Sequence, residues 1–414
     1  MIHYSRFVLK NGLTVIHHLD ENSQLAVLNL LYKVGSKEED PNKTGFAHLF
    51  EHLMFGGTPN IPEFDEPLQE AGGDSNAFTS NDITNYYLSL PLSNIETGFW
   101  LESDRMRGLA FSQKSLDVQK GVVIEEFKER YLNQPYGDIW LRILPLAYKE
   151  HPYSWPTIGK EISHIEEANM DQVKSFFKNF YAPNNCILVV AGNISLERVK
   201  ELCSIYFEDI PAQEIKRINY PQESVQTEAR FQEIQSDVPS NLILKAWHMG
   251  DRLSQNYYAM DLLSDILGSG KGSRLYDELV KKQAIFSEID AYISGDAEPG
   301  LFLIEGKLLP ETSFHQAENA IKGVLDEFFR TGCTDRELTM VQNKTETNIR
   351  FGDVNLLNRA MKLAFAEYLG DIELTNKEIN LYLDITKEIL LSEAKRTLVD
   401  TNCSTIHYKS SSND

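Results

Sequence analysis

An internal repeat constrains the fold of this chain more than any other feature of its sequence. Residues 48–57 (HLFEHLMFGG) match residues 261–270 (DLLSDILGSG) without gaps at an offset of 213, and the apolar positions and the final glycine persist. Residues 28–35 (LNLLYKVG) have a similar counterpart at 242–250 (LILKAWHMG). Two amphipathic helices can match by coincidence, whereas a duplicated domain explains both pairs. Under either interpretation the His, Glu and His of the first segment become Asp, Ser and Asp in the second, so the chemistry belongs to the first half.

Chain length agrees with a duplication. A chain of 414 residues is too long for one ordinary core and suits two domains of about 200 residues. The stretch 211–226 is polar, contains two prolines and shows no clear period, which indicates a linker. We therefore expect one domain at residues 1–210 and a homologous domain at residues 227–414.

The periodicity of the first half predicts both strands and helices. A hairpin is expected around the turn pair Asn11-Gly12, and a helix that begins near Thr44 is expected to stop at Gly56-Gly57. The predicted strands are 6–9, 13–17, 26–34, 83–90 and 187–190, and the predicted helices are 44–55 and 113–132. The fold class predicted for each domain is α+β, with an antiparallel β-sheet flanked by α-helices.

Charge and cysteine content argue against several classes of function. Lys and Arg number 40 against 61 Asp and Glu, so the net charge is −21, which disfavours nucleic acid and anionic membranes as partners. The four cysteines form no CxxC pair, and no apolar run is long enough to span a bilayer. With no signal peptide visible, we expect a cytoplasmic protein, although a trimmed N-terminus would leave a periplasmic one open.

The segment His48-Leu49-Phe50-Glu51-His52 has the spacing of a metal site on a helix. Residues four apart lie one turn above each other on the same helix face, so His48 and His52 can present two imidazoles to one zinc ion. The carboxylate of Glu51 can reach the open side of that ion and act as general base toward a zinc-bound water. This motif predicts a zinc-dependent hydrolase.

A catalytic zinc needs a third protein ligand, and the helix around 122–127 (VVIEEF) offers two carboxylates. Glu126 flanks the apolar stripe of this helix, whereas Glu125 points almost opposite. Helical phase therefore favours Glu126, although the same phase leaves open that both are solvated surface glutamates.

These residues also carry a family resemblance. HLFEH, followed 74 positions after His52 by Glu126 within VVIEEFKER, resembles the pitrilysin-type zinc metallopeptidases, or inverzincins, and in particular the zinc-binding subunit of the mitochondrial-processing-peptidase-like subgroup. Residues 71–91, 151–159 and 181–194 support the likeness strongly, and residues 268–279 (GSGKGSRLYDEL) extend it more loosely into the second half.

The resemblance implies one Zn²⁺ per chain, held by His48, His52 and Glu126, with Glu51 as the catalytic base. It makes the domain at 1–210 the catalytic peptidase domain and the domain at 227–414 the zinc-free one. It also implies that extended peptides add a strand to a sheet edge at Asn76, Ala77 and Phe78 and are cleaved inside a clam-shell chamber.

Two departures from the family pattern matter for activity. The family usually has a glutamate seven residues before the third ligand, where this chain has Gln119, which weakens a supporting electrostatic role. Active members also use an Arg and a Tyr from a non-zinc domain to hold the substrate carbonyl, and this chain has Val280 and Ser287 at those positions. Neither replaces such a donor, so we expect a homologous zinc-free subunit to supply Arg and Tyr in a heterodimer, or else a homodimer that manages without them.

Other readings remain open beside the peptidase. One is a non-catalytic or weakly active assembly or scaffold subunit descended from such peptidases, although such subunits characteristically lose the zinc residues. The glycine-rich stretch 268–273 lacks the spacing of a phosphate loop. His151, Tyr153 and Trp155 can line the peptide cavity, but packing after Pro152 explains them better.

Overall fold

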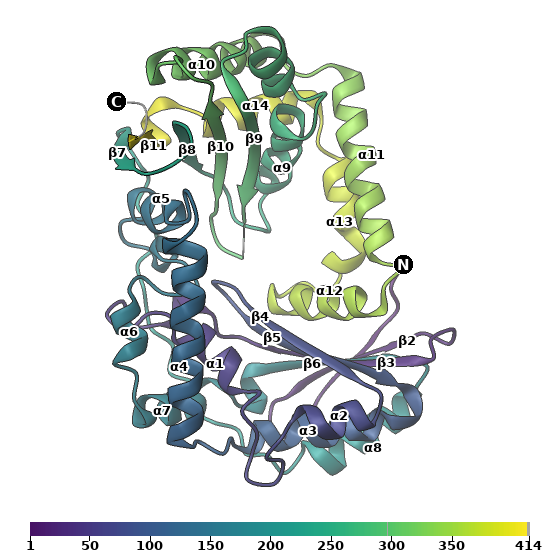
Figure 1. The fold of residues 1–414 in the computed structure, drawn as a ribbon. Helices are drawn as coiled ribbons and strands as arrows, with labels where there is room; N and C mark the ends of the chain where they lie inside the picture. The colour runs from purple at the N-terminus through teal and green to yellow at the C-terminus, as the bar shows by residue number, and fades with distance from the viewer. Residues whose placement is uncertain (296, 412–414) are drawn as a thin grey trace. The chain divides into compact units, whose positions relative to one another are not determined.

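The computed structural model describes residues 1–295 and 297–411, and the chain divides into two compact units. Unit 1 consists of Met1–Lys128, Trp155–Asn219 and Arg350–Asn376. Unit 2 consists of Glu129–Ser154, Tyr220–Ile349 and Lys377–Asp414. Each unit contains one β-sheet with helices packed on its faces (Figure 1).

Unit 1 is built on a six-stranded sheet with the order β1-β2-β6-β3-β5-β4. Its pairs are antiparallel except for β2 and β6, which run parallel. The strands are β1 (Ser5–Val8), β2 (Thr14–Leu19), β3 (Leu25–Tyr32), β4 (Asp74–Thr79), β5 (Thr84–Pro91) and β6 (Cys186–Gly192). The central strands β3 and β6 are buried along almost their whole length, whereas β4 alternates between exposed and partly buried residues at the edge of the sheet.

Helices cover both faces of this sheet (Figure 1). On one face α12 packs its small apolar residues, Ala360 and Ala364, into a core with Val27, Leu31 and Val189. On the other face α3 comes so close that a Cβ at its Gly98 would meet side chains of β3 and β5. The helices of unit 1 are α1 (Phe46–Leu53), α2 (Asp65–Glu70), α3 (Ile95–Arg107), α4 (Gln113–Phe127), α6 (Ile162–Glu166), α7 (Met170–Phe180), α8 (Leu196–Tyr206) and α12 (Leu356–Tyr368).

Unit 2 contains a five-stranded sheet with the order β7-β11-β8-β10-β9, in which only β7 and β11 are parallel. Alternate residues of β8 point to opposite faces, so Ile243 joins the core under α9 and α10 while Leu244 joins the core under α5. The strands are β7 (Arg230–Ser236), β8 (Leu242–His248), β9 (Phe286–Ser294), β10 (Leu301–Leu308) and β11 (Cys403–Ser410). The helices are α5 (Ile139–Ala147), α9 (Gln255–Gly268), α10 (Phe314–Thr331) and α14 (Lys387–Thr397), while α11 (Asp335–Gly352) and α13 (Leu374–Leu383) run across unit boundaries.

The two sheets have the same topology once β1 is set aside. Strands β2 to β6 of unit 1 occur in the same chain order, spatial order and direction as β7 to β11 of unit 2. Helix α1 follows β3 as α9 follows β8, and the offset of 213 places 46–53 over 259–266 inside α9. This correspondence favours the duplicated domain over coincidence, and the predicted α+β class with two sheets flanked by helices is confirmed.

The compact units are not contiguous halves of the chain. Residues 129–154, with α5, belong to unit 2, and residues 350–376, with α12, belong to unit 1. The last crossing from unit 1 to unit 2 before β7 falls between Asn219 and Tyr220, inside the irregular stretch 211–226. The division at 1–210 and 227–414 stays a prediction about the duplication in sequence. In the folded chain each sheet is covered by a helix from the opposite half of the sequence.

Most predicted elements of the first half occur, with differences at their ends. The first hairpin turns at Gly12, whose φ of 88° lies in the left-handed region. Helix α1 begins at Phe46 rather than Thr44 because Gly45 also has a φ of 88°, which cannot continue a right-handed helix. The predicted helix 113–132 is α-helical only to Phe127 and continues as a π-helical turn at Lys128–Leu132.

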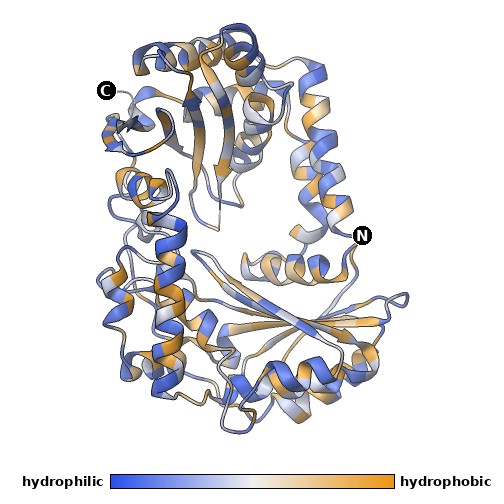
Figure 2. Ribbon diagram, viewed as in Figure 1, coloured by the Kyte–Doolittle hydropathy of each residue, from blue (hydrophilic) through white to orange (hydrophobic). Residues whose placement is uncertain are grey.

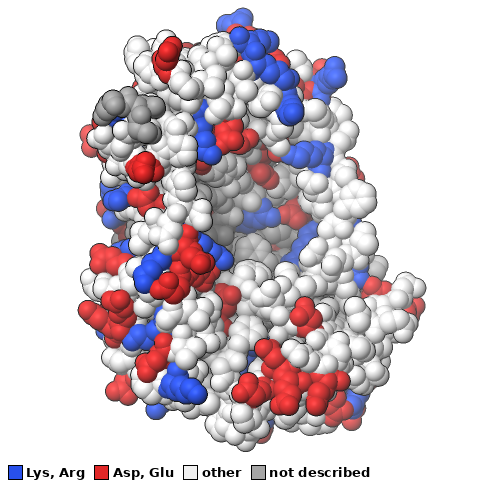
Figure 3. All heavy atoms as spheres, viewed as in Figure 1, with Lys and Arg blue, Asp and Glu red and all other residues white. Residues whose placement is uncertain are grey.

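Hydropathy and charge follow this architecture. Hydrophobic residues dominate the buried central strands β3 and β6, whereas the edge strand β4 is largely polar, and α4 alternates between hydrophobic and hydrophilic residues (Figure 2). On the face drawn in Figure 3, acidic side chains gather over α2 and α3, where α2 carries Asp65, Glu66 and Glu70. In the described part of the chain, no helix is long and apolar enough to cross a membrane.

Candidate metal centre

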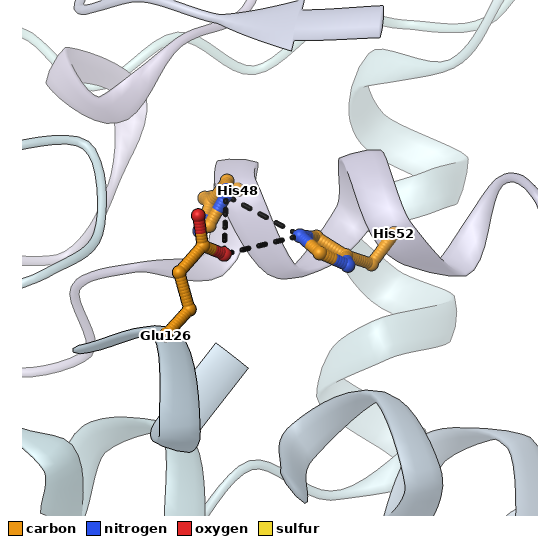
Figure 4. Close-up of side chains that lie close together, drawn as sticks. All are labelled: His48, His52 and Glu126. Atoms are coloured by element: carbon orange, nitrogen blue, oxygen red, sulfur yellow. Dashed lines mark hydrogen bonds and ion pairs between the residues drawn. The ribbon is translucent and has the colours of Figure 1, made fainter. Parts of the chain in front are cut away.

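His48, His52 and Glu126 meet in unit 1, where α1 faces α4 (Figure 4). The two Nε2 atoms of the histidines lie 3.3 Å apart. Glu126 Oε2 lies 3.6 Å from Nε2 of His48 and 3.6 Å from Nε2 of His52. Among the described residues, this is the only group of three or more His, Cys, Asp or Glu side chains that could hold a metal ion.

The spacing of these three atoms fits a zinc ion. A tetrahedral Zn²⁺ with bonds of about 2.0–2.1 Å requires its donor atoms to lie about 3.3–3.4 Å apart, close to the distances found here. Two imidazole nitrogens and one carboxylate oxygen are a donor set that zinc accepts in hydrolytic sites, with one corner left for water or substrate. The residues present therefore fit this metal, while zinc binding itself stays a prediction.

The helical periodicity of α1 explains why both histidines face α4. Leu49, Phe50 and Leu53 are buried on the side of α1 that packs into unit 1. His48 and His52 lie one turn apart on the remaining side, with their rings 4.8 Å apart and perpendicular.

Helix α4 presents Glu126 and not Glu125 to the histidines. Its buried residues Leu116, Val123 and Phe127 fix the rotation of the helix. The side chain of Glu126 is 18% exposed, whereas that of Glu125 is 68% exposed and forms an ion pair with Lys128 at 2.7 Å. Helical phase had indicated this orientation from the sequence.

Glu51 is held by a residue of the edge strand β4. The hydroxyl of Thr79 donates a hydrogen bond to Glu51 Oε2 at 2.6 Å. Thr79 is the last residue of β4 and pairs with Thr84 of β5. Thr79 lay inside the stretch that carried the family resemblance, but periodicity contains no signal for a contact between a helix and a distant strand.

The expected peptide-binding residues lie on an open strand edge. Asn76, Ala77 and Phe78 belong to β4, which pairs with β5 alone among the described strands. The side chain of Asn76 accepts a hydrogen bond from the backbone N–H of Ala77 at 2.8 Å. Phe78 is 40% exposed. The geometry suits strand addition, and a role for these three residues in peptide binding stays a prediction.

Two buried tyrosines, Tyr86 and Tyr181, lie next to Phe50 of α1. The hydroxyls of Tyr86 and Tyr181 lie 3.0 Å apart, and Tyr86 also lies 3.5 Å from the carbonyl oxygen of Phe50. Burial raises the pKa of both hydroxyls above the usual value of a tyrosine, so both stay neutral. Neighbouring Arg105 is buried, pairs with Glu102 at 2.6 Å and packs against Phe64 and Tyr86.

The corresponding helix of unit 2 has different chemistry. At the positions that match His48, Glu51 and His52, α9 carries Asp261, Ser264 and Asp265. The carboxylate of Asp261 accepts a hydrogen bond from Tyr382 at 2.5 Å, and Asp265 pairs with Lys344 at 2.8 Å.

Unit 2 also has no Arg or Tyr at the two positions where the family resemblance places them, because these positions are Val280 and Ser287. Val280 packs against the core of unit 2. Ser287, the second residue of β9, donates its hydroxyl to the carbonyl oxygen of Lys307 at 3.2 Å.

Two family models match the chain. One is described as insulinase, peptidase family M16, and covers residues 14–159. The other is described as the peptidase M16 inactive domain and covers residues 167–345. The first match contains the three candidate ligands and the second contains α9.

Named relatives cover nearly the whole chain. The zinc protease PqqE of Helicobacter pylori is 30% identical over 411 residues, which span 97% of this chain and 91% of that protein. The uncharacterized zinc protease YmxG of Bacillus subtilis is 24% identical and spans 80% of each chain.

Solved structures agree in fold. The crystal structure of a protease from Helicobacter pylori matches with a TM-score of 0.92 and 28% identity, covering 99% of this chain and 100% of that chain. The periplasmic protease PqqL from Escherichia coli matches with a TM-score of 0.80 and 20% identity, covering 99% of this chain but 48% of that one, so this fold also occurs as about half of a longer chain. With two family models, a relative at this identity over its length and the HLFEH motif in place, the chain belongs to the insulinase family of pitrilysin-type peptidases, M16.

Proposed function

We propose that the chain is the zinc-binding subunit of an endopeptidase that hydrolyses extended peptides. The observation that carries this proposal is the convergence of His48, His52 and Glu126 at distances suited to one Zn²⁺. Zinc at this site would supply Lewis acidity, which polarises a carbonyl group and lowers the pKa of water to about 7.

Glu51 is the general base of this proposal. Its carboxylate accepts the proton of the water that attacks the scissile carbonyl carbon, and then delivers it to the amine that leaves. The hydrogen bond that Thr79 donates to Oε2 of Glu51 restrains the carboxylate. Both roles require Glu51 to stay oriented during the reaction, and Thr79 provides that restraint.

The free edge of β4 is the proposed peptide site. A peptide in extended conformation would form backbone hydrogen bonds along Asn76, Ala77 and Phe78, which gives affinity with little dependence on the peptide sequence. Because Thr79 ends the same strand, a peptide on β4 lies next to the residue that restrains Glu51.

A second, homologous subunit completes the proposal. Neither Val280 nor Ser287 can donate to a developing oxyanion as Arg and Tyr do, and the loss of one such donor typically costs about 10²–10³ in rate. We propose that a zinc-free homologue supplies this Arg and Tyr in a heterodimer. In PqqL a fold of this kind forms about half of the chain, so it is joined there to a further stretch of similar length.

Metal content and peptide cleavage test the function together. We expect the purified chain to bind one zinc ion and Glu126→Gln to bind it more weakly, whereas Glu125→Gln serves as the matched control because Glu125 faces solvent. Glu51→Gln should keep the zinc and lose cleavage of an unstructured peptide. Zinc without cleavage, in the isolated chain and in its native complex, would favour a non-catalytic assembly subunit.

The partner is tested by recovering the tagged chain from its native lysate. We expect a homologous companion in a one-to-one complex, with cleavage by the pair well above that of the chain alone. A homodimer with family-like activity would contradict the heterodimer and leave the peptidase proposal intact.

A further inference from the structure

A buried carboxylate, Glu39, holds the N-terminus of α1. Its side chain lies seven residues before the start of that helix, and the residue is 3% exposed. Glu39 Oε1 accepts a hydrogen bond from the backbone N–H of Ala47 at 2.8 Å, and Oε2 accepts one from the N–H of Gly45 at 2.9 Å. The first turn of a helix leaves its N–H groups without partners inside the helix, and Gly45 has no side chain to cap them, so Glu39 performs that role.

Trp155 holds the same carboxylate from the opposite side. Its indole N–H lies 3.1 Å from Glu39 Oε2 and 3.1 Å from the carbonyl oxygen of Ser36. Burial raises the pKa of Glu39 to about 8, and the N–H donors of Ala47, Gly45 and Trp155 oppose that rise. Both oxygens accept hydrogen bonds, so the carboxyl group is held in one orientation by donors from α1 and from Trp155.

The segment that carries Glu39 is anchored to the turn after β4. The backbone N–H of Ser36 donates to the carbonyl oxygen of Ser80 at 3.2 Å, and that of Lys37 donates to Asn81 at 2.9 Å. This turn joins β4 to β5. Glu39 therefore connects the end of the open edge strand to the beginning of the helix that carries His48 and His52.

We infer that Glu39, held by Trp155, is a positioning residue for the metal centre, a role that rests on the proposed zinc function. Successive residues of an α-helix are rotated by about 100° about the helix axis. If the first turn of α1 moved or rotated, the side chains of both histidines would therefore turn relative to Glu126. A metal site tolerates displacements of only about 0.5 Å before its geometry is lost. By fixing Gly45 and Ala47, Glu39 fixes the position of His48 next to them.

Glu39→Gln tests this inference without disturbing a ligand. The amide NH₂ would face the N–H of Ala47 or of Gly45, which places two donors against each other. We expect zinc affinity, measured by competition with a chelator, to fall about tenfold or more. The visible absorption of the cobalt-substituted protein should also change, because it reports coordination geometry and not stability.

Glu38→Gln is the matched control. Glu38 is the adjacent buried carboxylate, and its Oε1 pairs with Arg217 at 2.7 Å. This variant removes a charge from the same segment and leaves the hydrogen bonds from Gly45 and Ala47 in place. We expect zinc affinity and the cobalt spectrum of Glu38→Gln to match those of the unaltered chain.

Trp155→Phe provides a second test, which decides the matter if Glu39→Gln does not fold. It removes the indole N–H and keeps an aromatic ring, and it should shift the cobalt spectrum in the same direction with a smaller loss of affinity. Unaltered affinity and spectrum in the folded variants would overturn the role of Glu39. Failure of the unaltered chain to bind zinc would instead overturn the proposed function.

Discussion

Single residues decide whether unit 1 can act as a hydrolase. The candidate ligands converge because α1 and α4 each turn one polar face toward the other, and the exposed neighbour Glu125 shows how sharply that face of α4 is defined. Thr79 adds a restraint on Glu51 that comes from a strand rather than from the helix itself. The hydroxyl group of Thr79 therefore contributes to the orientation of the base, and mutation can test that contribution.

Thr79→Val should lower kcat for peptide cleavage by roughly 10- to 100-fold with little change in KM, because the methyl group keeps the shape and removes the donor to Glu51. Steady-state kinetics of the active complex measures this, together with zinc content. Thr79→Ser, which keeps the hydroxyl, should retain most of the activity. An equal loss in both variants, or loss of zinc from Thr79→Val, would contradict the assigned role.

An ion pair joins two elements of unit 2 that are distant in sequence. Arg274 follows the glycine-rich stretch after α9 and forms a two-point ion pair with Glu337 in the first turn of α11, at 2.7 and 2.8 Å. The same guanidinium donates to the carbonyl oxygen of Gly332 at 2.8 Å. Burial acts to raise the pKa of Glu337, but hydrogen bonds from Arg274 and Thr334 outweigh it and lower the pKa to about 2.

Stability should therefore depend on pH through Glu337. Its pKa is lower in the folded chain than in the unfolded one, so the unfolded state binds the proton more readily in acid. The stabilisation is present above about pH 4.5 and is lost as the pH falls toward 2. Urea unfolding from pH 6 to pH 3 should show the advantage of the unaltered chain over Glu337→Gln shrinking, and a constant difference would contradict this prediction.

The whole molecule is a duplicated fold in which the halves exchange covering helices. Helix α12, late in the chain, covers one face of the sheet of unit 1, and α5, from the first half, covers one face of the sheet of unit 2. Both helices bury apolar strand residues that would otherwise meet water. Neither half of the sequence is then a complete folding unit.

A fragment of residues 1–219 should consequently fold poorly alone, because it lacks the Ala360, Leu363 and Ala364 face that covers Ile16, Val27 and Leu31. We expect low soluble yield and binding of a hydrophobic dye, with recovery when residues 220–414 are expressed beside it. Soluble yield and circular dichroism measure both. A fragment 1–219 that unfolds cooperatively at the temperature of the intact chain would show that α12 is dispensable.

The sequence alone predicts those features of the fold and of the candidate site that depend on a periodic pattern within one element or on the internal repeat. The 3.6-residue period places His48 and His52 on one face and favours Glu126 over Glu125, and the 213-residue offset indicates the duplication. The sequence around Trp155 indicates packing but no partner, because the hydrogen bonds of its indole reach Ser36 and Glu39, more than 110 residues away. Contacts between elements that are distant in sequence produce no periodic pattern of residues, so they cannot be predicted in this way.

By itself the sequence determined the HLFEH motif, the α+β class and the internal repeat, since each depends on residue type and spacing within one element or on self-similarity. Helical phase favoured Glu126 over Glu125 without excluding that both are solvated. Only the tertiary structure decided that Thr79 restrains Glu51, that Glu39 caps α1 and that α5 and α12 cover sheets formed mainly by the other half of the chain. These outcomes depend on which apolar faces are buried together, a choice made by the folded chain as a whole.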